Sequence, residues 1–422
     1  MHPPIPNAEL VEVRVPDQKT IVVIDDHSQS REQLSRILKE AGYLVVTVAD
    51  GDSGFLTVLK ENPDCVILDT MMQEMDGLEV CAKIRREESL KGIKLIVHSA
   101  KAYDYDRKRA LNFGADGFIP KPIRDERKFT ETLDDLINDD IVTTFWGVRG
   151  TLPVPGESSL RYGGNTSCVS VRIPGKPLVV FDAGSGIKNL GDFVLPRNGF
   201  HIDARIFISH PHWDHVNALP FFSPLYVPGN NVEICGPVNP DISVERMIYE
   251  QMSSIYFPIT VNELGASITY KDLLQGNYNF DGVEVSTMLL RHPGNCLGYR
   301  LTYNGRSICY VTDNELFPEH LDLYSGEYTE QLVEFVRGAD ILVTDSTYTD
   351  EEYQRHIGWG HSSISEVAKL ARDGLVKRLC LFHHDPGQSD YDIDRKLKKV
   401  ESILKDEDIE VLAPAEGFKI KI

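Results

Sequence analysis

The sequence predicts an α/β protein in which residues 19–139 form a five-stranded parallel sheet with helices on both faces. Five strand-length runs rich in β-branched residues alternate there with five amphipathic runs of helix length, as successive strand–helix–strand units do. Strand-like runs continue after residue 140, and ten of the thirteen histidines lie in that part. At about 100–200 residues per domain the chain allows two or three domains. We expect two, over residues 19–139 and 142–422, with a seam near Asp139-Asp140.

In chain order, the first half begins with a strand and ends with a helix. The expected strands are residues 19–26, 43–50, 64–70, 94–100 and 117–122. The expected helices are residues 28–42, 51–62, 78–90, 103–114 and 125–139. Functional sites of parallel sheets lie at the carboxyl ends of the strands. Those ends carry Asp25 and Asp26, Asp69, Ser99, and Lys121 with Pro122.

Three carboxylates at one crevice repel one another unless a hard cation lies among them, and Mg²⁺ prefers such oxygen ligands. Asp69 could then attack a phosphoryl group and form an acyl phosphate, with Ser99 and Lys121 contacting its oxygens. The alternative is that these acids are only solvated N-caps of the following helices.

Residues 19–139 resemble the receiver domain of two-component response regulators, which has a flavodoxin-like fold. Asp25 and Asp26 match the family's acidic pair and Asp69 its phosphoacceptor. Ser99, Lys121 and Phe118 match the switch hydroxyl, the lysine and the rotating aromatic residue. The resemblance implies bound Mg²⁺, a sensor histidine kinase as partner, and a homodimer through receiver domains.

Histidines and acids follow the expected strands of the second half. The run 204–209 leads into the H-x-H-x-D-H sequence that contains His210, His212, Asp214 and His215. Later strand-like runs lead to His292, Asp313 and the pair His383-His384. Nitrogen and carboxylate ligands without cysteine suit Zn²⁺, Mn²⁺ or Fe. The number of ligands exceeds what one tetrahedral ion takes and predicts a site for two metals.

Residues 142–422 resemble the metallo-β-lactamase superfamily of hydrolases, an α+β fold built as an αββα sandwich. The resemblance implies one metal on His210, His212 and His292, and a second on Asp214, His215 and either His383 or His384, with Asp313 bridging. In that superfamily the last ligand is usually followed by one residue, a Ser or Asp, and a Pro, so the resemblance favours His383 over His384.

A further motif pair resembles the phosphodiesterase branch of that superfamily, which includes tRNase Z. Asp345 lies in the run 344–348, and His361 lies in the run 360–363, just before a helix-like segment. By resemblance Asp345 orients His361, which contacts the scissile phosphate or protonates the leaving oxygen, while Asp214 orients the nucleophile. Alternatively His361 only caps the helix with its serines. Arg149 and Asn165 could reach the substrate. Alternatively, the glycines of this segment only shape a turn and Arg149 pairs with a carboxylate.

Composition limits the substrate and the partners. The net charge is −20, with 19 basic against 27 acidic residues up to residue 140 and 25 against 37 beyond it. An acidic surface disfavours broad capture of duplex DNA, long RNA or anionic membrane. Only 20 residues separate His292 from Asp313, where tRNase Z inserts its tRNA-gripping arm. No apolar run is long enough to span a bilayer, and seven scattered cysteines suit a reducing, cytoplasmic setting.

The sequence therefore predicts a response regulator whose output is a dinuclear-metal phosphodiesterase. We expect a small cyclic nucleotide or cyclic phosphate as substrate and control through phosphorylation of Asp69. The alternatives are a nuclease for single-stranded RNA or DNA, and a di-metal redox or ligand sensor without turnover.

Overall fold

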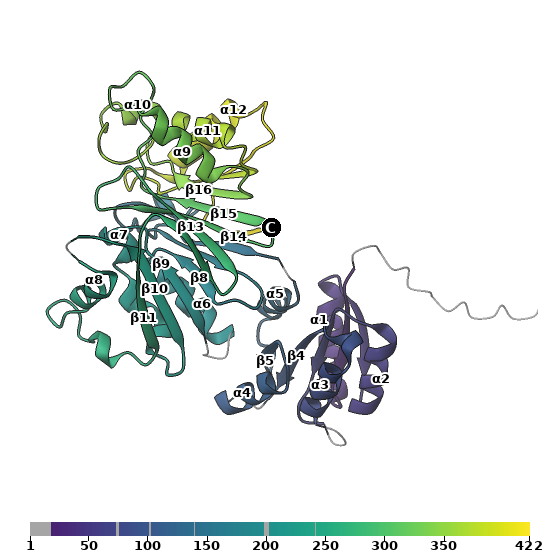
Figure 1. The fold of residues 1–422 in the computed structure, drawn as a ribbon. Helices are drawn as coiled ribbons and strands as arrows, with labels where there is room; N and C mark the ends of the chain where they lie inside the picture. The colour runs from purple at the N-terminus through teal and green to yellow at the C-terminus, as the bar shows by residue number, and fades with distance from the viewer. Residues whose placement is uncertain (1–17, 73–75, 101–102, 139, 198–201, 241) are drawn as a thin grey trace, which may run out of the picture. The chain divides into compact units, whose positions relative to one another are not determined.

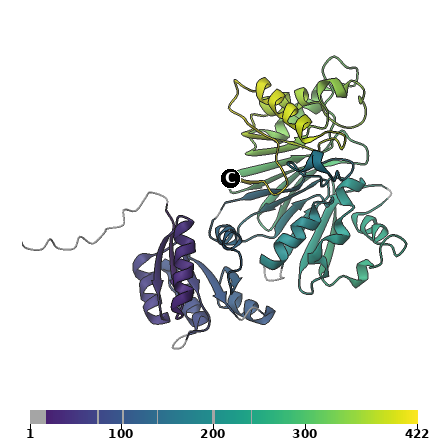
Figure 2. The ribbon, with the colours of Figure 1, turned by 180° about the vertical axis from the view of Figure 1, so that it is seen from behind.

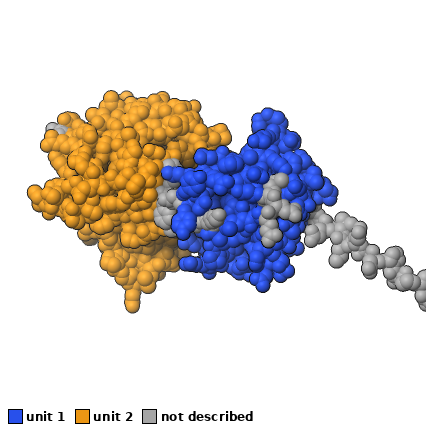
Figure 3. Space-filling model, turned by 90° about the horizontal axis from the view of Figure 1, so that it is seen from below, with its two compact units in different colours: residues 1–139, 197–199 blue, residues 140–196, 200–422 orange. Residues whose placement is uncertain are grey.

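The computed structural model describes residues 18–72, 76–100, 103–138, 140–197, 202–240 and 242–422. The chain divides into two compact units, residues 1–139 with 197–199 and residues 140–196 with 200–422 (Figure 3). Asp139, the expected end of the first domain, lies outside the described residues. Within the described part, no helix is long and apolar enough to cross a membrane.

The first unit is built on one parallel sheet with the strand order β2-β1-β3-β4-β5. Its strands are β1 (Thr20–Ile24), β2 (Leu44–Val48), β3 (Cys65–Leu68), β4 (Lys94–Ser99) and β5 (Gly117–Pro120). Its helices are α1 (Ser28–Glu40), α2 (Gly51–Glu61), α3 (Gly77–Arg86), α4 (Asp104–Asn112) and α5 (Glu126–Ile137). The expected five-stranded sheet with alternating helices is confirmed.

Alternation along the strands gives this sheet two apolar faces. Ile21 and Val23 of β1 pack with residues of α1 and α5, whereas Val22 and Ile24 pack with residues of α2, α3 and α4. Successive side chains of a strand point to opposite faces, so a strand that is covered on both sides is apolar at every position.

One expected helix of this unit is interrupted. The run 78–90 forms α3, and then Glu87 adopts an extended conformation before a short 3₁₀ turn, Glu88–Leu90. The break brings Leu90 into the apolar core of the unit, where only 2% of its surface is exposed.

The second unit consists of two seven-stranded sheets (Figure 1). The first has the order β11-β10-β9-β8-β7-β6-β19, formed by β6 (Val142–Gly147), β7 (Cys168–Arg172), β8 (Leu178–Phe181), β9 (Asp203–Phe207), β10 (Asn231–Pro237), β11 (Ser267–Leu273) and β19 (Lys419–Lys421). The second has the order β12-β13-β14-β15-β16-β17-β18, formed by β12 (Gly276–Phe280), β13 (Val283–Leu289), β14 (Leu297–Tyr303), β15 (Arg306–Val311), β16 (Ile341–Asp345), β17 (Arg378–Phe382) and β18 (Glu410–Leu412).

Seven α-helices accompany these sheets in the described residues. They are α6 (Ile187–Arg197), α7 (Trp213–Val216), α8 (Val244–Gln251), α9 (Gly326–Val336), α10 (Asp350–Tyr353), α11 (Ile364–Asp373) and α12 (Asp390–Ile403). Views from both sides show α9, α11 and α12 gathered beyond the second sheet (Figures 1 and 2).

Three apolar layers hold this unit together. Phe145, Phe181 and Phe207 of the first sheet pack against Tyr299 and Tyr310 of the second in the central layer. A second layer joins the first sheet to α6 and α8, and a third joins the second sheet to α9, α11 and α12. The expected αββα sandwich is confirmed, and its strand ends carry the candidate site.

Candidate metal centre

The candidate site of the second unit is assembled from the ends of four strands. His210, His212, Asp214 and His215 follow β9, His292 follows β13, Asp313 follows β15 and His383 follows β17. Since these strands belong to both sheets, stacking of the sheets brings together side chains as far apart as residues 210 and 383.

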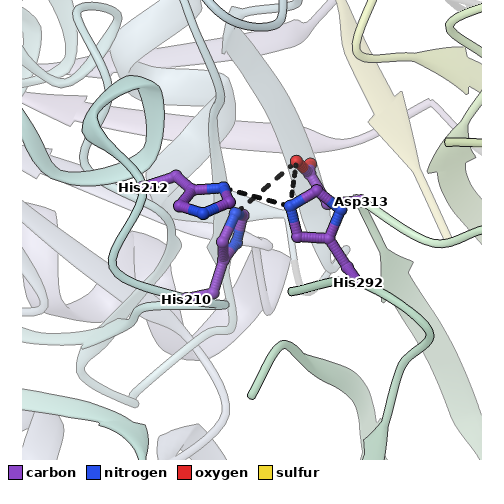
Figure 4. A group of neighbouring side chains, drawn as sticks. All are labelled: His210, His212, His292 and Asp313. Atoms are coloured by element: carbon purple, nitrogen blue, oxygen red, sulfur yellow. Dashed lines mark hydrogen bonds and ion pairs between the residues drawn. The ribbon is translucent and has the colours of Figure 1, made fainter. Parts of the chain in front are cut away.

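Four of these side chains form the first group, in which the rings of His210, His212 and His292 face the carboxylate of Asp313 (Figure 4). Their candidate ligand atoms all lie within 4.8 Å of one another. The Nε2 atoms of His210 and His292 are each 3.6 Å from Oδ2 of Asp313. The Nε2 atom of His292 lies 3.0 Å from Nδ1 of His212.

Asp313 also belongs to a second group, with Asp214, His215 and His383. Its Oδ1 atom is 3.2 Å from Nε2 of His215 and 3.1 Å from Nε2 of His383. The two oxygens of one carboxylate therefore face two different groups. This is the geometry that a ligand shared between two cations needs.

The chemistry of the donors fits a pair of divalent cations. The Nε2 atoms of His210 and His215 are buried and have no hydrogen-bond partner within the described residues. Burial raises the pKa of Asp313, but the histidines around it outweigh burial and hold this pKa well below its ordinary value. Uncharged imidazole nitrogens and ionised carboxylates are the ligands that Zn²⁺ and similar ions take.

The last expected ligand was either His383 or His384. The Nε2 atom of His383 lies 3.1 Å from Oδ2 of Asp214, whereas the ring of His384 lies beside Tyr162, at 6.3 Å between ring centroids. His384 belongs to none of the candidate metal groups formed by the described residues. The structure therefore brings His383 to the site.

Asp182 is a buried residue of this site that sequence reasoning missed. Its Oδ2 atom accepts hydrogen bonds from Nδ1 of His215 and from the hydroxyl of Tyr310, both at 2.7 Å. These bonds turn Nε2 of His215 toward the candidate metals. An acid directly behind the strand-like run 178–181 was the available signal, but a single acid there has no distinctive spacing.

His361 lies beside the second group and is paired with Asp345. Its Nδ1 atom lies 2.7 Å from Oδ2 of Asp345, and its ring stacks on His383 at 5.0 Å. Burial lowers the pKa of His361, but the carboxylate of Asp345 outweighs this and raises it to about 9. The pair is therefore suited to hold a proton next to the metal groups.

Glu315 fixes the segment that leads to His361. Its carboxylate is only 2% exposed and accepts hydrogen bonds from the backbone of Gly358 and Gly360, both at 2.7 Å. The carbonyl of Gly360 in turn accepts from Nδ1 of His292 at 2.9 Å. Gly360 has a φ of +89°, and a Cβ there would lie 2.4 Å from the His292 ring, so the position requires glycine.

Arg149 and Asn165 serve the scaffold. The buried guanidinium of Arg149 donates to the carbonyls of Gly163 and Gln388. Asn165 donates to Glu416 through its backbone and side chain. The Arg149 guanidinium also lies 3.5 Å from the carboxylate of Asp390, so the structure supports the interpretation in which Arg149 pairs with a carboxylate.

The first unit contains the other acidic cluster, formed by Asp25, Asp26 and Asp69. The ammonium of Lys121 lies 2.7 Å from Asp25 and 2.6 Å from Asp69. Burial raises the pKa of Asp25, but hydrogen bonds from Lys121 and Ser30 outweigh burial and hold this pKa below its ordinary value. All expected acids thus meet at the carboxyl ends of β1 and β3, beside the lysine that follows β5.

The expected switch residues lie on the neighbouring strands. The hydroxyl of Ser99 is 2.6 Å from that of Thr70, the residue after Asp69. Phe118 of β5 is 9% exposed, with the guanidinium of Arg107 over its ring at 5.2 Å.

Comparison with known proteins agrees with this architecture. Residues 21–134 match the family model described as the response regulator receiver domain, and residues 178–384 match the one described as the beta-lactamase superfamily domain. Among curated relatives, the alkaline phosphatase synthesis transcriptional regulatory protein PhoP of Bacillus subtilis is 34% identical over 104 residues, 25% of this chain and 42% of that protein. The response regulator MprA of Mycobacterium ulcerans is 33% identical over 134 residues, 30% of this chain and 57% of that protein.

Among solved structures, the metallo-beta-lactamase fold protein YhfI from Bacillus subtilis is similar, with a TM-score of 0.50 and 17% identity. The similarity covers 67% of this chain and 100% of that one, and it concerns the fold. The chain spans only about half the length of the curated relatives it matches.

Proposed function

Because the chain joins a response-regulator receiver domain to a metallo-β-lactamase domain, we propose that it is a response regulator whose output is a dinuclear-metal phosphodiesterase. Its substrate is a small cyclic nucleotide or cyclic phosphate, and phosphorylation of Asp69 controls it. The receiver domain implies a sensor kinase as partner, and the superfamily implies divalent metals.

The observation that carries the proposal is the division of Asp313 between two groups of ligands. Its Oδ2 atom faces His210 and His292, and its Oδ1 atom faces His215 and His383. Two divalent cations bound there, Zn²⁺ or else Mn²⁺ or Fe, supply Lewis-acid activation of a water and of the phosphoryl oxygens.

The chain itself supplies the proton and its placement. His361 carries a proton that Asp345 stabilises, and donates it to the departing alkoxide as general acid. Asp214 is fixed by the backbone N–H of Thr151, 2.7 Å from its Oδ2 atom, and orients the attacking water. Pairing an acid with an orienting carboxylate favours cleavage of a phosphodiester, whose leaving group needs a proton.

Two features support a small substrate. Between His292 and Asp313 the chain forms only the antiparallel pair β14 and β15, so no long arm is inserted there. The net charge of −20 opposes the capture of long polyanions.

In the receiver domain, Mg²⁺ bound by Asp25, Asp26 and Asp69 would allow phosphoryl transfer to Asp69. Ser99 and Lys121 would contact the phosphoryl oxygens, and Phe118 would respond to the movement of Ser99. The added charge changes the surface that this domain presents.

A screen of cyclic mono- and dinucleotides with protein loaded with Zn²⁺, Mn²⁺ or Fe²⁺ tests the proposal. We expect hydrolysis of at least one of them, loss of hydrolysis in a chelator, and about two metals per chain. Asp313→Ala should lose both metals, because both groups share this residue. Full metal loading without hydrolysis of any phosphodiester, bis-p-nitrophenyl phosphate included, would contradict the proposal and favour a sensor without turnover.

A further inference from the structure

The open edge of the metal centre is marked by the exposure of its residues. Of the seven candidate ligands, His212 is exposed and His292 is half-buried, although the His292 side chain is only 4% exposed. The other five are buried: His210, Asp214, His215, Asp313 and His383. A substrate from solution therefore approaches past His212.

Two exposed tryptophans adjoin this edge. The chain has three tryptophans, and Trp146 is buried in the core. Trp213, which follows His212, is 82% exposed, and Trp359, which precedes Gly360, is 62% exposed. His212 and Gly360 both contact the ring of His292. Each tryptophan is therefore the sequence neighbour of a residue that contacts this candidate metal ligand.

Trp359 is held in place by the structure around it. Its ring packs edge-on against His356 at 4.7 Å, His356 stacks on Tyr348 at 4.4 Å, and Tyr348 reaches His361 at 6.0 Å. The backbone on both sides of Trp359 is bonded to the buried carboxylate of Glu315. A rigid aromatic surface with little entropy to lose is what stacking of a ligand requires.

We propose that Trp213 and Trp359 form a stacking platform for a nucleobase, so that the substrate is a nucleotide rather than a base-free cyclic phosphate. This inference rests on the proposed function. Exposed apolar surface that gathers beside a polar site is typical of a ligand-binding groove. A flat π-system is the part of a nucleotide that tryptophan binds, and such stacking tolerates any base.

The platform separates the binding of the base from the chemistry at phosphorus. Base–aromatic stacking contributes on the order of a ten- to hundredfold gain in affinity per base. The benefit should appear in Kd and KM for nucleotides, while kcat, which depends on the metals and His361, stays close to the wild-type value.

Calorimetric titration of the metal-loaded protein with adenosine 5′-monophosphate and with ribose 5-phosphate tests the platform without any turnover. We expect the nucleotide to bind at least tenfold more tightly and to quench tryptophan fluorescence. Trp213→Ala or Trp359→Ala should weaken nucleotide binding about tenfold or more and leave ribose 5-phosphate binding unchanged. The corresponding Trp→Phe variants should retain most of the preference.

Tyr391→Ala is the matched control, because Tyr391 is a 69% exposed aromatic residue of α12 and should not alter either affinity. Equal binding of the two ligands, or a preference that survives both Trp→Ala changes, overturns the platform. Hydrolysis of bis-p-nitrophenyl phosphate is measured on the same samples. If that hydrolysis is absent while the nucleotide preference depends on the tryptophans, the phosphodiesterase proposal fails and the platform stands.

Discussion

His361 is the residue at which proton transfer can be separated from metal binding. With Asp345 and His383 it forms a separate group of candidate ligand atoms, but it is not one of the seven side chains of the two groups that Asp313 joins. If His361 only capped the following helix, its removal would leave turnover unchanged. Ser363 rather than His361 occupies the N-cap of α11, which weakens that interpretation.

We expect His361→Ala to keep the metal content of the wild type and to lose turnover of bis-p-nitrophenyl phosphate by about 10²–10⁴-fold, the usual contribution of a general acid. Metal analysis and steady-state rates on the same preparation check this. Unchanged turnover would remove His361 from the mechanism.

Asp182 acts on the metals through His215. Its carboxylate accepts from Nδ1 of His215 and from Ser209 and Tyr310, so it fixes which ring nitrogen faces the site. Loss of such an outer partner typically weakens metal binding by about 10- to 100-fold.

For Asp182→Asn we predict metal affinity lower by about that factor, measured by competition with a chromogenic chelator. Asp340→Asn is the control, since Asp340 is also a buried acid but pairs with Lys377 and Ser307. That variant should lose stability without losing metal affinity. Equal metal affinity in the wild type and Asp182→Asn would show that His215 is oriented by other contacts.

At the scale of elements, strand ends bring the chemistry together in both domains. In the receiver domain β4 also carries a titratable residue inside the sheet, His98, which is 3% exposed and lies 2.9 Å from the carbonyl of Ile119 through Nδ1. Burial lowers its pKa to about 4. The neutral ring is therefore the form that the folded domain accommodates.

A lowered pKa makes the stability of the receiver domain dependent on pH. Below about pH 6.5 the unfolded chain binds a proton at His98 that the folded domain refuses until about pH 4, so stability falls as the pH falls through this window. Between pH 7 and pH 5 the loss should be about 2 kcal/mol.

His98→Leu lacks this titration. The opening free energy of β4 and β5 is measured by hydrogen exchange in the full chain. The wild-type value minus the variant value should fall by about 2 kcal/mol from pH 7 to pH 5. A difference that is constant with pH would mean that His98 does not titrate in this window.

At the scale of the whole molecule, the proposed function requires that phosphorylation of the receiver domain changes the hydrolysis rate or the assembly of the chain. In the receiver domain Lys121 pairs with both Asp25 and Asp69, and phosphorylation would change the charge at this crevice. A response regulator whose output is an enzyme should transmit that change to its rate or to its assembly.

Titration with beryllofluoride and Mg²⁺ should therefore change the hydrolysis rate or the oligomeric state in a saturable way, and Asp69→Ala should abolish the response. Rates and sedimentation are measured in parallel. If neither changes in the wild type, the two domains act independently and the proposed control of hydrolysis is wrong.

Much of this protein could be read from its sequence because the signals are local. Strand runs of period two, helices of period 3.6, and acids or histidines directly behind strands depend only on neighbours along the chain. These local signals predicted the sheet of the receiver domain and the residues that the structure gathers into the metal groups and the acidic cluster. The fold of the second domain was predicted from its resemblance to the metallo-β-lactamase superfamily.

Other features depend on the packing of segments that are distant in sequence, and only the tertiary structure decided them. Stacking of the two sheets placed His383, which the resemblance had favoured over His384, against Asp214. It also gave the two oxygens of Asp313 different neighbours and placed Asp182 behind His215. It also directed Arg149 into the scaffold, and it left Trp213 and Trp359 exposed next in sequence to His212 and Gly360, which both contact His292. A side chain's partners across such an interface are fixed by where the backbones meet, and no local pattern of residues encodes that position.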